Sequence, residues 1–277
     1  MGEMMSKRLL LIVIFIILAG SLLYQQGRVP VQQPAGPGTA VVAVKPSPTA
    51  EARAFPAGVP ILMYHSIAEE PGNDAVISKA RFLEQMKYLH EHDYHPITLD
   101  DLDAYLTKKQ DLPLRPVVIT FDDGYRDTYE VAMPVLKQYG FRSVLFFPMG
   151  KDGGRLSWDE LREMKASGMD IASHSYNHRS MGDLSRAEQA EEIKSSKRVL
   201  DQQLNQNTRW FCYPNGSYGP ETLELLKTNG FTVAVTIDPG WAKPGDSPLT
   251  LRRIWMGNNV DLKHFEERLT KENYSML

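Results

Sequence analysis

The chain has 277 residues, and 31 lysines and arginines stand against 34 aspartates and glutamates, giving a formal net charge of −3 at pH 7. No basic stripe supplies phosphate contacts, which argues against nucleic acid as a partner. The single cysteine, Cys212, excludes an intramolecular disulfide. Its place in an apolar strand favours a small buried residue over a nucleophile.

A basic start and an apolar run open the chain. Lys7 and Arg8 precede the largely apolar stretch 9–24, a pattern typical of an export signal or a short membrane anchor, to which we assign residues 1–26. A cleaved signal and an uncleaved anchor both fit. The stretch has neither an Ala-x-Ala site nor the cysteine of a lipoprotein signal, which favours the anchor.

Residues 27–56 are rich in proline and glutamine and have too little apolar content to build a core. We interpret them as an extended tether. The remaining residues, 57–277, suit one α/β domain. An anchor, a tether and a domain predict an extracytoplasmic protein, either membrane-anchored or secreted, that acts on a polymer outside the membrane.

Within that domain, strand-like apolar runs alternate with amphipathic segments. The strands are expected near 59–64, 116–121, 143–148, 169–173, 209–213, 231–236 and 250–254. Helical periodicity is clearest in 81–92, 125–139, 158–167, 186–204 and 220–228, and Gly140, Gly168 and Gly230 stand where left-handed caps are expected. Repeated strand–helix units predict a parallel sheet, and seven strands favour a closed or partly closed barrel. No glycine-rich nucleotide signature occurs, so a nucleotide cofactor is not expected.

Two short segments carry the chemistry. Residues 120–125 read Thr-Phe-Asp-Asp-Gly-Tyr and follow an apolar strand, so both carboxylates can serve one site only if the strand ends there, at a turn that suits Gly124. Residues 173–178 read Ser-His-Ser-Tyr-Asn-His, and the spacing places the two imidazoles together on one helical turn. One carboxylate and two histidines can hold a catalytic divalent metal, which leaves the other carboxylate as a base. The spacing does not tell which aspartate has which role.

The two segments resemble the first two motifs of the NodB-homology polysaccharide deacetylases, carbohydrate esterase family 4. The resemblance continues through residues 210–216, near the third motif, and covers roughly residues 57–277. It implies a deformed (β/α) barrel, with Asp122 as the base and Asp123, His174 and His178 as metal ligands. Zinc is the expected ion, and cobalt or another divalent ion can also support activity.

A histidine near the start of the domain adds a further candidate. Residues 59–66 read Val-Pro-Ile-Leu-Met-Tyr-His-Ser, and His65 resembles the histidine of the family's last motif, which acts as the general acid. Its position at the N-terminus resembles the circularly permuted, poly-N-acetylglucosamine deacetylase-like subgroup. A strand-end histidine without a catalytic role is the alternative.

The third motif departs from the family pattern. The family carries an arginine that steadies the base, followed by an aromatic residue whose backbone N–H helps to hold the oxyanion, and Cys212 and Asn215 stand at these positions. A backbone donor does not depend on the side chain, so we assign the oxyanion role to Asn215. Arg253 is a candidate replacement for the arginine, with a surface charge as the alternative. Trp241 is a candidate apolar wall, with plain packing as the alternative.

Together these features predict a metal-dependent N-deacetylase of a polysaccharide that contains N-acetylglucosamine, in a bacterial cell envelope. We expect a monomeric catalytic domain and membrane contact through the N-terminal segment. The alternatives are an O-acetyl esterase with the same site and a catalytically silent glycan-binding wall protein. Peptidoglycan, poly-N-acetylglucosamine and chitin oligomers share the acetamide, and the N-terminal place of His65 favours poly-N-acetylglucosamine.

Overall fold

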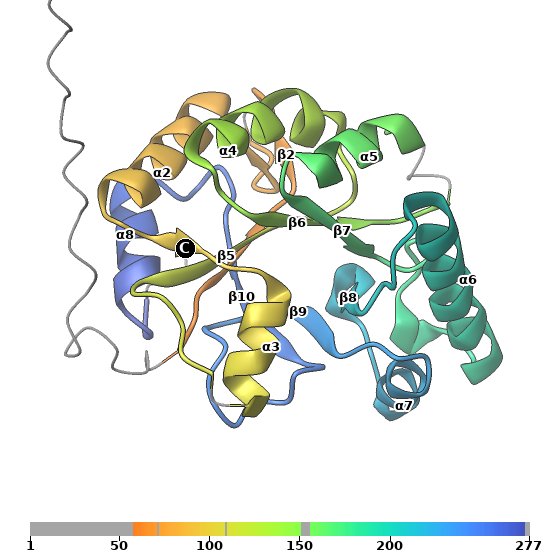
Figure 1. Ribbon diagram of the computed structural model, residues 1–277. Coiled ribbons are helices and arrows are strands. Elements are labelled where there is room, and N and C mark those ends of the chain that lie inside the picture. The colour runs from red at the N-terminus through yellow and green to blue at the C-terminus, as the bar shows by residue number, and fades with distance from the viewer. Residues whose placement is uncertain (1–57, 71, 109, 151–155, 275–277) are drawn as a thin grey trace, which may run out of the picture. The chain divides into compact units, whose positions relative to one another are not determined.

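The computed structural model describes residues 58–70, 72–108, 110–150 and 156–274 (Figure 1). The predicted anchor at 1–26 and tether at 27–56 lie outside these residues. Among the residues that are described, no helix is long and apolar enough to cross a membrane.

Parallel strands form a closed barrel at the centre of the described domain. Around the ring its seven strands are β1 (Ile61–Tyr64), β10 (Leu251–Trp255), β9 (Val233–Pro239), β8 (Trp210–Cys212), β7 (Met169–Ser173), β6 (Ser143–Phe147) and β5 (Pro116–Phe121). Parallel pairing of β1 with β5 closes the ring. The short strand β4 (His95–Pro96) pairs with β5 outside the ring, and β2 (Ser66–Ile67) pairs with β3 (Val76–Ile77) in a separate two-stranded sheet.

Helices pack around the barrel (Figure 1). They are α2 (Lys79–Glu91), α3 (Leu99–Lys108), α4 (Met133–Tyr139), α5 (Trp158–Ala166), α6 (Arg186–Leu204), α7 (Pro220–Thr228) and α8 (Leu262–Thr270). Three short helical segments, η2 (Thr128–Ala132), η4 (Met181–Asp183) and η5 (Pro214–Gly216), complete the connections.

The expected barrel of about seven parallel strands is confirmed, and the five expected helices are present. One helix differs, because residues 128–132 of the expected segment 125–139 form a π-helix. Such wider turns occur frequently next to functional sites. The glycines Gly140, Gly168 and Gly230 have φ values of 68°, 104° and 79° after their helices, as their positions predicted. The helices α3 and α8 were not expected.

Strand alternation decides which side chains enter the barrel. Ile61, Val118, Ala172, Cys212 and Leu251 belong to one buried cluster, whereas their strand neighbours pack in other clusters with the helices. Because successive side chains point to opposite faces, the inward positions continue with period two towards the carboxyl ends of the strands. Residues 65, 122, 174 and 253 follow in this phase. The barrel interior therefore collects polar side chains at one rim.

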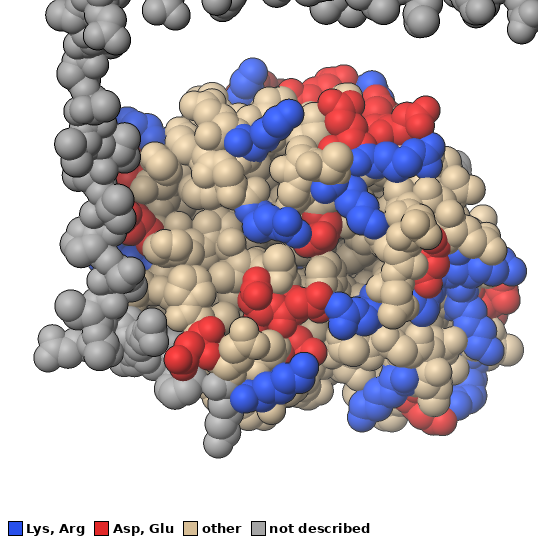
Figure 2. Space-filling model, viewed as in Figure 1, with Lys and Arg blue, Asp and Glu red and all other residues tan. Residues whose placement is uncertain are grey.

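Charged side chains of both signs are interspersed on the face shown in Figure 2. Among the described residues, ion pairs join neighbouring helices, such as Arg186 of α6 with Glu224 of α7 at 2.9 Å and Arg126 with Glu160 of α5 at 2.7 Å. Exposed pairs of this kind add little to stability. The surface charge on this face thus contributes mainly to solubility.

Protonation of Glu188 should weaken the start of α6. Ser185 and Glu188 form a capping box, and its hydrogen bonds, with Arg179, lower the pKa of Glu188 from 4.5 to about 2. A depressed folded-state pKa means that the ionised carboxylate stabilises the fold fully above pH 4.5 and loses this effect as the pH falls towards about 2. Urea unfolding should therefore show Glu188→Gln less stable than wild type at pH 7, with the gap closing in acid. Glu84→Gln, an exposed change on α2, should show no such gap.

Candidate active site

A buried ion pair joins β5 and β10 inside the barrel. Nη1 of Arg253 donates to Oδ1 of Asp122 at 2.8 Å, and Nη2 donates to Oδ2 at 2.6 Å. Arg253 also donates from Nε to the carbonyl of Thr236 and from Nη1 to the hydroxyl of Thr120. Burial acts to raise the pKa of Asp122, but the charge and hydrogen bonds of Arg253 outweigh it and hold the pKa below its ordinary value. The carboxylate is therefore ionised at neutral pH.

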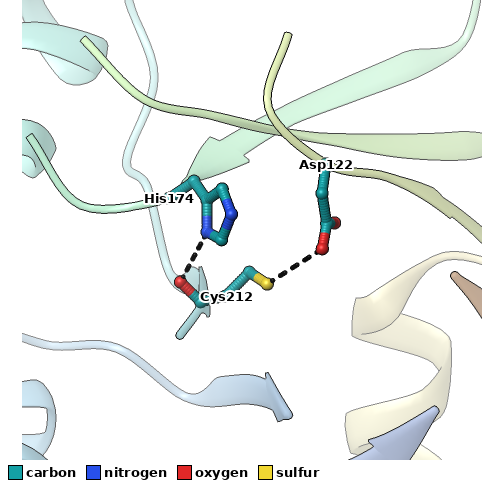
Figure 3. A group of neighbouring side chains, drawn as sticks. All are labelled: Asp122, His174 and Cys212. Atoms are coloured by element: carbon teal, nitrogen blue, oxygen red, sulfur yellow. Dashed lines mark hydrogen bonds between the residues drawn. The ribbon is translucent and has the colours of Figure 1, made fainter. Parts of the chain in front are cut away.

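The side chain of Cys212 contacts Asp122, and its backbone carbonyl contacts His174 (Figure 3). Its thiol donates to Oδ2 of Asp122 at 3.4 Å, and its sulfur accepts from Nη2 of Arg253 at 3.1 Å. Burial raises the pKa of Cys212 well above its ordinary value, so the group is a neutral thiol. Its carbonyl lies 2.9 Å from Nδ1 of His174.

His65 lies beside the carboxylate of Asp122 at the end of β1. Its Nε2 is 4.0 Å from Oδ2 of Asp122, and its ring lies against Trp255 with centroids 5.1 Å apart. The next residue, Ser66, donates to Oδ2 of Asp127 at 2.6 Å, which ties the segment after β1 to the segment after β5. Burial lowers the pKa of His65 from its ordinary value of 6.5, although the carboxylates of Asp122 and Asp123 act to raise it.

The side chains of Asp123, His174 and His178 converge next to Asp122 and His65. Oδ1 of Asp123 lies 3.3 Å from Nε2 of His174 and 3.0 Å from Nε2 of His178. The strand β5 ends at Phe121, and Asp123 and Gly124 take left-handed φ values of 71° and 67°, as a turn at this point requires. A Cβ at Gly124 would meet the ring of Phe147 at 2.6 Å, so only glycine fits there. The turn directs Asp122 into the barrel and Asp123 towards the histidines.

The two histidines do not share a helical turn, so that prediction was wrong. Residues 174–178 form a loop after β7, in which Ser175 and His178 have left-handed φ values of 62° and 56°. The loop still brings the rings together, with centroids 4.6 Å apart. A helical spacing of four residues predicted the proximity, but a strained loop produces it.

Glu192 of α6 accepts hydrogen bonds from this loop. Sequence reasoning missed this residue. Its Oε2 accepts the backbone N–H groups of Tyr176 at 2.9 Å and Asn177 at 2.7 Å, and its Oε1 accepts the Asn177 amide at 2.9 Å. Glu192 is buried, which is unusual for a glutamate. The signal in the sequence was helical spacing. Glu192 stands next to Ile193 and eight residues before Leu200, on the face of the helix that these apolar residues mark as buried.

The group of Asp123, His174 and His178 fits a divalent cation. The three ligand atoms lie within 4.8 Å of one another, and Oδ1 of Asp123 is buried with no hydrogen-bond partner. Because a carbonyl oxygen only accepts, the contact of His174 Nδ1 with Cys212 places the proton on Nδ1 and leaves the Nε2 lone pair for a metal. One carboxylate and two imidazoles form a donor set that suits zinc and related ions.

Asp122, His174 and Cys212 also lie close enough to form a metal group (Figure 3). That group fits a cation less well. Both oxygens of Asp122 already accept from the guanidinium of Arg253, whose positive charge repels a metal ion. The thiol would also have to lose a proton that burial holds firmly.

Two candidates from the sequence remain, Asn215 and Trp241. Asn215 has a left-handed φ of 55° in the turn after β8, and its side chain donates to Ser180 at 2.9 Å. Trp241 packs against the core, and its indole N–H donates to the carbonyl of Arg268 at 2.9 Å. These are the contacts of a packing residue. The aromatic ring beside the site is Trp255 instead, which sequence reasoning missed.

A closed parallel barrel with an ionised buried carboxylate, a neighbouring imidazole and a three-ligand metal group at its carboxyl-terminal rim defines a class of protein. This class is the hydrolases built on a (β/α) barrel, whose site residues here could hold a divalent cation.

Comparisons with known proteins give the family. The family model described as polysaccharide deacetylase matches residues 109–234. YxkH of Bacillus subtilis, a protein assigned by name to the polysaccharide deacetylases, is 37% identical over 202 residues, which are 72% of this chain and 71% of that protein. A poly-β-1,6-N-acetyl-D-glucosamine N-deacetylase of Staphylococcus aureus is 26% identical over 218 residues, with 72% and 73% of the two chains covered.

Solved structures agree. The deacetylase PplD of Streptococcus pyogenes, solved with acetate, matches with a TM-score of 0.74 and 29% identity over 78% of this chain and 100% of that chain. IcaB from Ammonifex degensii matches with a TM-score of 0.67 and 28% identity, covering 78% and 97%. The chain belongs to the polysaccharide deacetylase family. The expected enzyme class, a polysaccharide deacetylase, is thereby confirmed.

Replacing Arg253 should destabilise the protein strongly. Arg253→Met leaves the Asp122 carboxylate buried without its cation, and breaking a buried ion pair in this way costs about 3–5 kcal/mol. Denaturant unfolding at pH 7 measures the loss. Arg252→Met, an exposed change on the same strand, is the matched control and should have a far smaller effect. The double variant Asp122→Asn/Arg253→Met should be more stable than Arg253→Met alone, and equal stability of Arg253→Met and wild type would contradict the ion pair.

Proposed function

We propose that this protein removes N-acetyl groups from an extracellular or cell-wall polysaccharide that contains N-acetylglucosamine, in a metal-dependent reaction. The observation that carries the proposal is the position of Asp122 and His65. Oδ2 of Asp122 and Nε2 of His65 lie 4.0 Å apart, next to the three-ligand group of Asp123, His174 and His178. A base and an acid within reach of one reacting centre are what amide hydrolysis needs.

In the proposed reaction Asp122 acts as the general base. Its low pKa keeps the carboxylate ionised, and Arg253 holds both oxygens in fixed positions. Asp122 takes a proton from the attacking water, whose oxygen forms a new bond to the acetamide carbonyl carbon. A divalent cation held by Asp123, His174 and His178 would supply Lewis acidity to this step.

His65 and Asn215 act on the other two atoms of the amide. We assign the backbone N–H of Asn215 to the carbonyl oxygen, where negative charge develops. The C–N bond then breaks, and His65 in its protonated form gives a proton to the departing nitrogen. The products are acetate and a glucosamine unit. The Staphylococcus aureus relative, by its name, acts on poly-β-1,6-N-acetyl-D-glucosamine, which supports this substrate class.

The direct test of the function is acetate release with zinc or cobalt added. The substrates are poly-N-acetylglucosamine, peptidoglycan and chitin oligomers. An acetylated xylan serves as the ester comparison. Release from the ester alone would identify an O-acetyl esterase. Glycan binding with no acetate from any substrate would identify a catalytically silent protein.

Variants of neighbouring site residues should affect metal binding and catalysis differently. His178→Ala removes one ligand, so we expect loss of both bound metal and activity. Asp122→Asn keeps the three proposed ligands, so it should retain the metal and lose most of the rate, on the order of a hundred- to ten-thousand-fold. Metal content by elemental analysis and acetate release measure the two properties. Full activity of metal-stripped protein in a strong chelator would refute the metal assignment.

The acid role of His65 predicts a change in pH dependence. A general acid must be protonated, so activity should fall as the pH rises through a pKa that burial holds below 6.5. His65→Ala should lose this basic limb and most of the rate on an N-acetylated oligomer. The loss should be smaller for an aryl acetate, whose leaving group needs no proton. Equal impairment of the two substrates would show that His65 is not the acid.

A further inference from the structure

Arg268 of α8 is a buried cation. Only 3% of its surface is exposed. Nη1 donates to the carbonyl of Trp255, the guanidinium carbon lies 5.4 Å from the centre of the Tyr274 ring, and Nε has no hydrogen-bond partner. In the part of the chain that the structure describes, no carboxylate forms an ion pair with it. Arg253, the other buried arginine, is held by both oxygens of Asp122.

An unpaired buried charge is expensive, because the protein interior solvates it poorly. Burial lowers the pKa of Arg268, but an arginine side chain stays charged at neutral pH. One backbone carbonyl and one aromatic face offset only part of the lost hydration. The guanidinium group therefore has hydrogen-bonding capacity left for an anion that is not part of the fold.

Arg268 faces a pocket that opens beside the reacting centre. The pocket has a volume of about 380 Å³, and its lining includes Ile237, Arg253, Trp255, Asn259, Arg268 and Tyr274, together with one acidic residue, Asp74. Trp255 also lies against the imidazole of His65, so the pocket and the proposed acid share one aromatic ring.

The strand β9 shapes the mouth of this pocket. Leu251 pairs with Val235 but Arg253 pairs with Pro239, so β9 carries two more residues than β10 over the same stretch. Such a bulge turns side chains out of the sheet. Ile237 lies in the bulge and is 48% exposed, an apolar surface next to the tryptophan. Apolar and aromatic surface above a buried cation suits a sugar that carries an acidic substituent.

We propose that this pocket is a subsite for an oxyanion, a carboxylate or a phosphodiester, carried by the glycan whose acetyl group is removed. The planar guanidinium of Arg268 provides donors in a fork that matches two oxygens, and Asn259 adds an amide at the same pocket. The inference rests on the proposed deacetylase function and makes its substrate an acidic glycan. A neutral homopolymer of N-acetylglucosamine would leave Arg268 unpaired.

The test compares acetate release from soluble oligosaccharides of equal length. One is a neutral N-acetylglucosamine oligomer, one alternates N-acetylglucosamine with N-acetylmuramic acid, one is the methyl ester of the latter, and one carries a phosphodiester-linked glycerol. We expect wild type to have a higher kcat/KM on an acidic oligomer than on its neutral counterpart. Arg268→Met should lower kcat/KM on that oligomer about tenfold to a hundredfold and change the neutral one little. The acidic oligomer that wild type prefers shows whether the subsite binds a carboxylate or a phosphodiester.

Matched variants separate recognition from folding. Lys263→Met removes an exposed charge from the same helix and should leave the preference unchanged, whereas Arg268→Lys should retain part of it. An equal loss on acidic and neutral oligomers in Arg268→Met would mean a structural role and overturn the proposal. So would a wild type without preference for either acidic group.

Two further measurements complete the test. If no oligomer is deacetylated, the proposed function fails, but calorimetric binding of the acidic oligomers to wild type and Arg268→Met still decides the subsite. Deleting the residues after Tyr274 tests whether the chain supplies the anion itself. An acidic preference that appears only after this deletion would mean that the deleted residues block the site in the intact chain, and would overturn the proposal.

Discussion

Closure of the barrel by β1 and β5 is the constraint on which the site depends. Ile61, Leu62, Met63 and Tyr64 pair with residues 118–121 in parallel register. The contact continues one residue further, because the backbone N–H of Asp122 donates to the carbonyl of Tyr64 at 3.0 Å. The first strand of the domain thus ends beside the strand that carries the two aspartates. His65 reaches Asp122 for this reason alone, since the two residues are far apart in sequence and lie on strands that only closure makes neighbours.

The buried charges in the barrel depend on the same closure. Since β10 pairs with β1 and β1 pairs with β5, the side chain of Arg253 can cross the interior to Asp122. The small Cys212 on β8 leaves room for it, with its sulfur 3.1 Å from Nη2 of the guanidinium. A long cation from one strand and a short thiol from another therefore fill the space together. The pair keeps the carboxylate ionised and oriented, which a general base requires.

The metal group depends on backbone conformations that need support from outside the barrel. Asp123, Ser175 and His178 all have left-handed φ values, and each such residue costs of order 1–3 kcal/mol. Glu192 compensates at the histidine loop by accepting three hydrogen bonds at 2.7–2.9 Å. Its helix, α6, packs on β7 and begins with a capping box. The helix α6 supports the proposed metal ligands as much as the strands that precede them do.

The sequence by itself determined the barrel strands and the types of residue at their ends, because the apolar runs and the Asp-Asp-Gly and His-x-x-x-His segments are local patterns. It also indicated that Arg253 stood on a strand. Only the tertiary structure decided that Arg253 meets Asp122, that Cys212 touches both, and that Trp255 rather than Trp241 lies beside His65. It likewise revealed Glu192 and Arg268, single residues on otherwise ordinary helices. These contacts join elements distant in sequence, and their partners follow from strand register and side-chain reach once the barrel has closed, which no local pattern encodes.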